Sequence, residues 1–272
     1  MNAVVSLAAN EFRLGLRNRW VALAILLLGG LALALALLGT APAGNSGVDR
    51  LTATSISLAS LSIYLLPLIA LLLAHDAIAG EQERGTLLLL LTYPMPRWQL
   101  IAGKFLGHGL VLALATVIGF GLAAAVLWGG SAAGFGIFLR MLGSSLLLAM
   151  AFLAIGYAIS AWCTETSAAA GLALAAWLVL VLLYDLGLLA LLVADEGLLL
   201  GQQTLPALLL ANPADAYRLY NLVSLPDTAM LTGMAGLMEQ LALPAVLPLL
   251  TLILWIVGPL GLAAWLLQRR SP

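Results

Sequence analysis

Charge is scarce in this chain of 272 residues, since Asp, Glu, Lys and Arg together make up 8% of it. About a quarter of an ordinary soluble domain is charged. The shortage therefore excludes a soluble globular protein and indicates an integral membrane protein. The charge is also balanced, at a formal net charge of −1, so the chain lacks the basic surface that nucleic acid requires.

Cysteine occurs once, at Cys163, which excludes an internal disulfide and any metal site built from several cysteines. The chain has no G-x-x-x-x-G-K-[ST] phosphate loop, so we do not expect it to bind ATP in that manner. It also lacks H-E-x-x-H and G-x-S-x-G. Tyr184-Asp185 is similar to one half of the aspartate pair of intramembrane aspartyl proteases. The partner motif G-x-G-D is missing, and we expect no catalysis by this chain.

Hydrophobic residues make up 63% of the chain, and the mean hydropathy is +1.11. Because about 20 apolar residues cross the hydrocarbon core as a helix, the long apolar runs predict six membrane spans. They lie at about 20–38, 56–77, 105–127, 137–162, 168–193 and 246–267. The second contains Pro67, where a membrane helix tolerates a kink. The first run is too long for a cleaved signal and is interpreted as an uncleaved anchor.

Residues 1–19 predict an amphipathic helix that lies in the membrane interface. At about 100° per residue, polar and apolar side chains separate onto opposite faces. The polar face holds Asn2, Ser6, Asn10, Arg13 and Arg17, and the apolar face holds Val4, Val5, Ala8, Phe12 and Leu16. The alternative is an ordinary basic flank of the first span.

Basic residues predict the orientation of the spans. With the N-terminus inside, the cytoplasmic segments hold Arg13, Arg17, Arg19, Arg84, Arg97, Lys104, Arg269 and Arg270. The outer segments hold only Arg50, Arg140 and Arg218. This asymmetry satisfies the positive-inside rule, so both termini and the segment 79–104 are expected in the cytoplasm.

The segment 79–104, between the second and third spans, holds the densest charge in the chain. Its charged residues Glu81, Glu83 and Arg84 are followed by Gly85, which should break the helix. Thr86 is the predicted N-cap of the next helix. That helix is the apolar run of Leu87, Leu88, Leu89, Leu90 and Leu91, which ends before Tyr93 and Pro94.

Five leucines are too few to cross a bilayer. From the residues alone, the run predicts either a coupling helix docked into a cytoplasmic partner or a helix that lies in the lipid interface. Nearby, His75, Asp76 and His108 close the second span and open the third. They predict a polar clamp that braces this segment, with a His–Asp–His metal site as the alternative.

The segment 194–245 is the largest outer element. We expect short helices at about 205–211, 217–225 and 229–243, separated by Asn212-Pro213 and by Leu225-Pro226-Asp227. Leucine-rich helices outside the membrane should lie on its surface or receive another protein. In the third helix, Met230, Met234 and Met238 share one face. Thioethers suit Cu(I), but such a stripe is also typical of flexible packing, so no metal site is firmly predicted.

Asp185 is an ionisable residue within the fifth span, and such residues are costly and often functional. Arg140 or a wet cavity is its expected partner, in either a structural pair or a conformational pathway. Small residues at Gly103 and Gly107, four apart, predict close helix packing within the chain or between copies of it.

The pattern E-x-E-R-G-T-(L)n-x-Y-P-x-P-R-x-x-L-x-x-G-K in segment 79–104 resembles the coupling segment of ABC-2-type transporter permeases. The resemblance implies an all-α integral membrane protein with six transmembrane helices and the ABC-2, type V exporter-like, permease fold. It also implies that residues 81–94 contact a separate ABC ATPase, which binds ATP and Mg in place of this chain.

Further runs, at 11–20, 57–61, 66–74, 103–109, 167–174 and 212–219, resemble the NosY-type permeases of nitrous oxide reductase maturation systems. That resemblance implies a homodimer in the bacterial inner membrane with a NosF-like ATPase, a periplasmic β-helical NosD-like protein and, indirectly, a NosL-like copper chaperone lipoprotein. The expected contacts to the periplasmic protein are Asn212, Pro213, Asp215, Tyr217, Arg218 and Tyr220.

The expected function is ATP-driven maturation of copper sites, either by conformational transmission to the periplasmic partner or by export of a sulfur species. Few polar residues lie within the spans to line a hydrophilic pore, namely Asp185, Tyr64, Tyr157, Ser144 and Ser145. This scarcity favours transmission. The alternatives are a generic lipid or drug exporter of the same fold and a structural anchor without ATP linkage.

Overall fold

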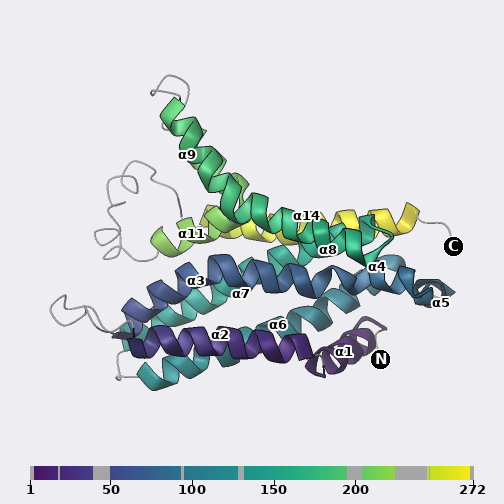
Figure 1. Cartoon of the computed structure of the whole chain (residues 1–272), viewed down its shortest axis with the longest axis horizontal. Helices are drawn as coiled ribbons and strands as arrows, with labels where there is room; N and C mark the ends of the chain where they lie inside the picture. The colour runs from purple at the N-terminus through teal and green to yellow at the C-terminus, as the bar shows by residue number, and fades with distance from the viewer. Residues whose placement is uncertain are drawn as a thin grey trace.

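Long apolar helices run side by side along the molecule in the computed structural model (Figure 1). The structure describes residues 3–17, 19–38, 50–92, 95–127, 132–194, 204–223, 244 and 246–269. Most of the described residues are helical, and none of them lies in a strand. The long helices are α2 (Arg19–Leu38), α3 (Arg50–Ala74), α6 (Arg97–Leu127), α7 (Ala132–Trp162) and α14 (Val246–Arg269). One further long stretch is divided into α8 (Thr166–Trp177), η2 (Leu178–Leu183) and α9 (Tyr184–Ala194).

Five helical stretches are long and apolar enough to cross a membrane: Leu51–Glu83, Arg97–Leu127, Ala132–Trp162, Thr166–Ala194 and Val246–Arg269. They correspond to the second to sixth predicted spans and extend beyond most of their predicted ends. The first predicted span is α2, in which the apolar stretch Ala22–Leu37 is shorter than the other five. At 20 residues, α2 is about 30 Å long, close to the thickness of the hydrocarbon core.

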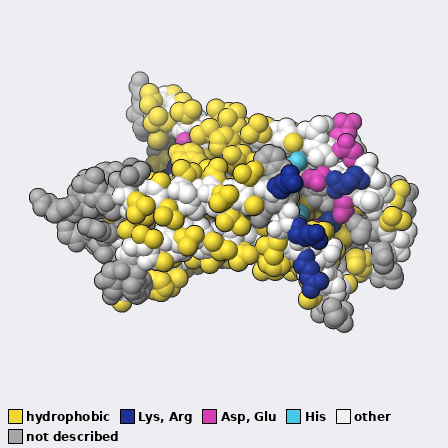
Figure 2. Space-filling model, turned by 60° about the horizontal axis from the view of Figure 1, so that its bottom comes forward, with side chains coloured by type: hydrophobic (Ala, Val, Ile, Leu, Met, Phe, Trp, Pro, Cys, Tyr) yellow, Lys and Arg dark blue, Asp and Glu magenta, His cyan; other side chains and the backbone are white. Residues whose placement is uncertain are grey.

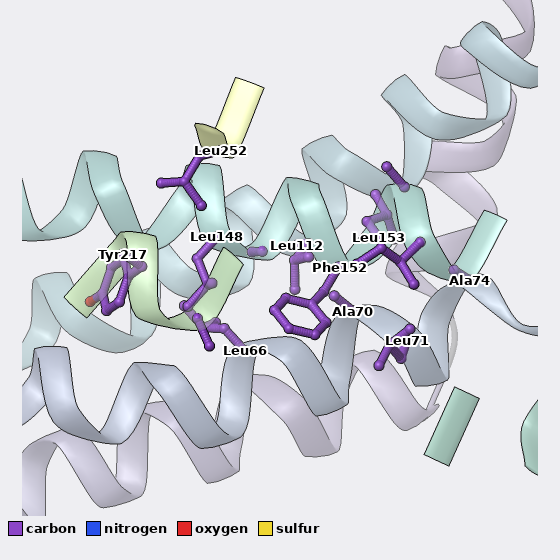
Figure 3. Packing of buried hydrophobic residues seen from close by; sticks show 14 of the residues in the cluster. Leu66, Ala70, Leu71, Ala74, Leu112, Leu148, Phe152, Leu153, Tyr217 and Leu252 are labelled. Carbon is purple, nitrogen blue, oxygen red and sulfur yellow. The ribbon is translucent and has the colours of Figure 1, made fainter. Parts of the chain in front are cut away.

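The centre of the molecule is α7, whose apolar span is 67% buried, more than any of the other four. It packs mainly against α3 and α14. Phe152 and Leu148 of α7 meet Leu66 and Ala70 of α3 in one cluster of buried residues (Figure 3). Since lipid is as apolar as leucine, close packing rather than water exclusion holds such helices together.

The N-terminal helix α1 (Ala3–Leu16) packs on the start of α6. A Cβ placed on Gly107 would lie 2.5 Å from Cβ of Glu11 and 2.8 Å from the carbonyl oxygen of Ala8. The absent side chain is therefore what lets α1 approach so closely. The predicted pair of small residues in this stretch thus serves packing within the chain, because Gly103 also faces α1, at Leu7.

The predicted apolar face of α1 divides between two environments. Ala8 is buried against the protein, whereas Val5 and Leu16 are exposed. On the opposite side, Arg13 and Arg17 are exposed as expected. The helix therefore has one side for α6, one for an apolar surrounding and one for water, which is the division that an interfacial helix needs.

The fifth span contains a π-helical turn, η2, between α8 and α9, which the sequence analysis did not predict. Only 6% of this span is buried. The lower part, α8, contacts α3, α4 and α7, whereas α9 leaves the bundle at an angle (Figure 1). Trp177, the last residue of α8, donates from its indole N–H to the carbonyl of Tyr64 at 3.0 Å.

Two short helices, α10 (Thr204–Ala211) and α11 (Pro213–Val223), follow on the same side of the bundle as α9. The first was predicted correctly. The second was predicted to begin at 217, with Asn212-Pro213 as a separator, but it begins at Pro213. The carbonyl oxygen of the Asn212 side chain accepts a hydrogen bond from Ala214 N–H at 3.0 Å. Asn212 is thus an N-cap and Pro213 the first helical residue, where proline is favourable.

Candidate functional site

The predicted coupling segment consists of two helices, α4 (Asp76–Glu83) and α5 (Thr86–Thr92). Between them Gly85 adopts a φ of 72°, a left-handed conformation that glycine accepts without strain. Thr86 was predicted to be the N-cap of the second helix, and this is wrong. Thr86 is already helical, and its hydroxyl donates to the carbonyl of Glu81 at 3.2 Å, so it caps the end of α4.

The short helix α5 lies at one end of the molecule (Figure 1). Leu87 is 5% exposed and packs inward, but Leu88 and Leu89 are 57% and 66% exposed. The side chains of Leu90 and Leu91, together with Tyr93 and Pro94, lie outside the described residues. Two exposed leucines beside charged residues form a small apolar patch, which is suited to bind in a groove of another protein.

The side chain of Glu81, a predicted contact to the ATPase, is 15% exposed and faces the interior of the protein. Its Oε1 is 2.6 Å from Nζ of Lys104, and the same Nζ lies 2.6 Å from Oε1 of Glu11. We call Glu11, Glu81 and Lys104 the root cluster, because they join α1, α4 and α6 beneath the coupling segment. Buried carboxylates of this kind are stable only while their partner is present.

Sequence reasoning missed Glu11 and Lys104 as functional candidates. Glu11 belongs to neither predicted face of α1, and Lys104 stands at the start of a long apolar run. A charge that fits no helical face is the signal that could have found Glu11. Its partner could not have been identified, because 93 residues separate the two.

His75, Asp76 and His108 do not form the predicted clamp or a shared metal site. Nδ1 of His75 bonds to the carbonyl of Leu72 at 2.7 Å, and Asp76 lies 3.4 Å from Nη1 of Arg84. His108 bonds through Nδ1 to the hydroxyl of Tyr157 at 2.7 Å. Within the described ranges, no group of three His, Cys, Asp or Glu side chains is arranged to hold a metal ion.

Two other contacts fasten α4 to the spans. The hydroxyl of Ser160 in α7 accepts hydrogen bonds from Ile78 N–H and Ala79 N–H, each at 3.0 Å, and donates to the carbonyl of His75 at 2.7 Å. Oε2 of Glu83 accepts from Thr166 N–H at 2.9 Å at the first turn of α8. A carboxylate is favourable there because it faces the positive end of the helix dipole. Movement of α4 is thus tied to α1, α6, α7 and α8.

Asp185 has a different partner from the expected Arg140. Its Oδ2 lies 2.9 Å from Nη2 of Arg218, and its Oδ1 lies 3.2 Å from Nη1. Nη1 of Arg218 also lies 2.7 Å from Oδ1 of Asp215. Burial raises the pKa of Asp215 to about 7, although the Arg218 charge lowers that pKa. Arg218 was not predicted as the partner of Asp185, because its helix was expected outside the bundle.

Most residues predicted to contact the periplasmic partner lie inside the protein. Asn212, Pro213, Asp215 and Tyr217 are buried, and Arg218 and Tyr220 are half-buried. The hydroxyl of Tyr217 bonds to that of Ser145 at 2.8 Å, and its ring lies near Leu148 and Leu66 (Figure 3). Four of the six predicted contact residues are therefore buried within the chain, and contact of this segment with a periplasmic partner stays a prediction. Met230, Met234 and Met238 lie outside the described residues, so their copper contact stays a prediction.

Comparisons with known proteins agree with this geometry. The family model described as ABC-2 family transporter protein matches residues 5–271. The chain belongs to the ABC-2 transporter permease family. It is 50% identical to a protein of Pseudomonas aeruginosa and 49% identical to one of Stutzerimonas stutzeri, with 99% of each chain covered. Both relatives are described as a probable ABC transporter permease protein NosY.

Membership of the family accounts for both the all-helical fold and the coupling segment. ABC-2 permeases are membrane proteins with several apolar helices, as this chain is. The chain is thus a membrane permease of an ABC transporter. In an ABC transporter the permease works with an ATP-binding subunit, so the exposed leucines of α5 acquire an expected type of partner.

Proposed function

We propose that this permease couples ATP hydrolysis in a separate cytoplasmic ATPase to the maturation of the copper sites of nitrous oxide reductase. The observation that carries the proposal is the contrast within α4 and α5. Leu88 and Leu89 are exposed at the end of the molecule, whereas α4 is fastened to four other helices. Force applied to α5 is therefore passed to the spans.

The proposed assembly is a homodimer in the bacterial inner membrane, with both termini in the cytoplasm. Each copy binds a NosF-like ATPase, which holds ATP and Mg. On the outer side, a NosD-like β-helical protein is the partner, and a NosL-like copper chaperone acts through it. The identity of about half to relatives described as NosY over nearly their whole length supports this assignment.

Conformational transmission, rather than passage of a hydrophilic substrate, is the mode that the polar residues favour. Asp185 pairs with Arg218, Tyr157 with His108, and Ser145 with Tyr217. Ser144 donates to the side-chain oxygen of Asn221 at 3.1 Å. With these groups engaged in contacts inside the chain, few are left to replace the hydration shell of a polar substrate. A sulfur species remains the alternative cargo.

The experiment is purification of the tagged chain from its native membrane in mild detergent, followed by an ATPase assay. We expect an ATPase and a periplasmic protein to copurify with the wild type. Replacing both Leu88 and Leu89 by Asp should reduce the recovered ATPase by about tenfold or more, since burying two carboxylates in an apolar groove is costly. A matched control replaces Val5 and Leu16, the exposed apolar residues of α1, by Ala.

The control should retain the ATPase at the wild-type level. Equal loss in both variants would show that exposed apolar residues in general, rather than α5, determine recovery, and this would overturn the docking role. An ATPase that arrives without a periplasmic partner would favour the generic lipid or drug exporter. A chain that purifies alone would favour the structural anchor.

A further inference from the structure

The π-helical turn η2 lies between α8, which has buried residues, and α9, which has none. In a π turn each carbonyl is bonded five residues on, and such turns mark sites where a helix bends or serves function. Tyr184 N–H accordingly bonds to the carbonyl of Val179. The neighbouring carbonyl of Leu180 accepts a hydrogen bond from Nδ2 of Asn212 at 2.7 Å. The irregular backbone is thus stabilised by the cap residue of α11.

Below the turn, α8 is anchored, with Ala169 and Ala173 buried against the bundle. Above it, α9 has no buried residue, and Val193 near its end is 73% exposed. Figure 1 shows α9 pointing away from the other helices. Among the described residues, hydrophobic packing therefore contributes little to the direction of α9, and polar contacts at its first residues join it to the neighbouring helices.

Two such contacts join α9 to the short outer helices. The hydroxyl of Tyr184 donates to the carbonyl of Leu208 at 2.6 Å. Both terminal nitrogens of Arg218 donate hydrogen bonds to the carboxylate of Asp185. This bidentate arrangement fixes direction as well as distance. Tyr184 and Asp185 are the first two residues of α9, so both contacts act at its base. The Arg218–Asp185 pair is the charged one of the two, and Arg218 belongs to α11, in which Asp215 and Tyr217 are buried.

We propose that Arg218 is a positioning residue that sets the direction of α9, and that η2 is the hinge about which α9 swings when the pair with Asp185 opens. This inference rests on the proposed function in one respect, since the swing is the outer response to ATP-driven movement of the spans. The hinge itself is a property of the chain alone.

The charges around Arg218 lower the free-energy cost of opening the Arg218–Asp185 pair. Arg218 also contacts Asp215, on its own helix. When Asp185 leaves, the guanidinium keeps one carboxylate and is never stranded without a partner, which would be the costly outcome. The side chain of Asp185 is 37% exposed, so the protein does not enclose it completely. Opening the Arg218–Asp185 pair therefore loses one ion pair but does not leave Arg218 without a carboxylate.

The test measures a distance within one chain by pulsed electron paramagnetic resonance in lipid nanodiscs. Spin labels are attached to cysteines placed at Val193 of α9 and Leu139 of α7, both exposed, in a background with Cys163→Ala. Labelled chain is diluted with unlabelled chain, so that distances between copies do not contribute. Asp185→Leu should broaden the distance distribution by about twofold or more, as hinge motion requires.

Three comparisons decide the result. Asp185→Leu leaves the Arg218–Asp215 pair intact, so the variant should insert and fold. Asp185→Glu should keep the narrow distribution, and so should Arg140→Gln, which removes a positive charge that does not contact Asp185. An Asp185→Leu distribution as narrow as the wild type would overturn the positioning role. Equal broadening in Arg140→Gln would attribute the effect to charge in general and would overturn it too.

The proposed function is tested separately in the same samples. With the copurified ATPase present, a non-hydrolysable ATP analogue should shift the wild-type distance. A shift that is absent while Asp185→Leu still broadens the distribution would contradict ATP coupling but leave the hinge intact. A wild-type shift without any effect of Asp185→Leu would support coupling and contradict the hinge.

Discussion

Lys104 is the positive charge of the root cluster and faces both of its carboxylates. Its ammonium group lies 2.6 Å from each of two carboxylates, Glu11 and Glu81, and it is 3% exposed. Oε2 of Glu81 is buried and has no hydrogen-bond partner. Removal of the lysine would therefore leave two acids facing each other in the interior.

We expect Lys104→Met to destabilise the folded protein by about 3–5 kcal/mol, the cost of leaving a buried ionic partner uncompensated. The measurement is the loss of monodisperse protein in detergent after heating through a series of temperatures. Glu11→Gln is the matched comparison, because Lys104 keeps Glu81 as its partner and the total charge becomes balanced. Its effect should be much smaller. Equal losses in the two variants would contradict the central role of the lysine.

The sequence predicts which residues of the coupling segment are charged, but not where they point. Glu81 and Glu83 are two positions apart on one helix, yet Glu81 faces Lys104 inside the protein and Glu83 faces the first turn of α8. Helical spacing separates such residues onto different sides. Which side is interior depends on helices distant in the sequence, and a single sequence does not contain that information.

Among whole elements, α1 depends on glycine for its position on α6. Gly107→Val would place carbon atoms where Cβ of Glu11 and the carbonyl of Ala8 already lie. We expect this overpacking to destabilise the folded protein by about 1–3 kcal/mol, which is sufficient to displace α1. The sensitive measurement is trypsin cleavage at Arg13 and Arg17, which should become about tenfold faster when α1 detaches.

Gly121 provides the control for this element, since it lies in the same helix and has no atom within 4 Å of its Cβ position. Gly121→Val should leave the cleavage rate unchanged. Equal acceleration in both variants would indicate a general effect of valine on α6. Unchanged cleavage in Gly107→Val would contradict the packing of α1.

Helices that cross the membrane were predictable because their length and composition are set by the bilayer. The elements that were wrongly predicted are those for which contacts within the chain override composition. The apolar residues at 178–183 continue the fifth span without any sign of a π turn. Likewise α11, polar by composition, was expected outside, but its polar side chains find partners such as Ser145 and Asp185 within the bundle.

Along the whole molecule, α4 and α5 lie at one end, and α9 and α11 lie toward the other (Figure 1). At 31 residues, α7 is about 46 Å long, enough to span the hydrocarbon core with some tilt. Because α4 is fastened to α7 through Ser160 and α11 to the same helix through Ser145, one rigid helix joins both regions. In the proposed function, a movement of the coupling segment would be transmitted along α7 to α11, which holds Arg218.

This transmission requires that α5 face the ATP-containing compartment, and the orientation is a prediction that fusion proteins can test. Both α1 and the end of α14 lie at the same end as α5 (Figure 1), and Lys and Arg side chains gather there (Figure 2). The positive-inside rule therefore predicts that this end is cytoplasmic. Green fluorescent protein fused after residue 272 should fluoresce, and alkaline phosphatase at the same position should be inactive. The two reporters serve as controls for each other, because each is active on one side only. An active phosphatase would place α5 outside, where no ATPase could reach it, and the coupling role would have to be abandoned.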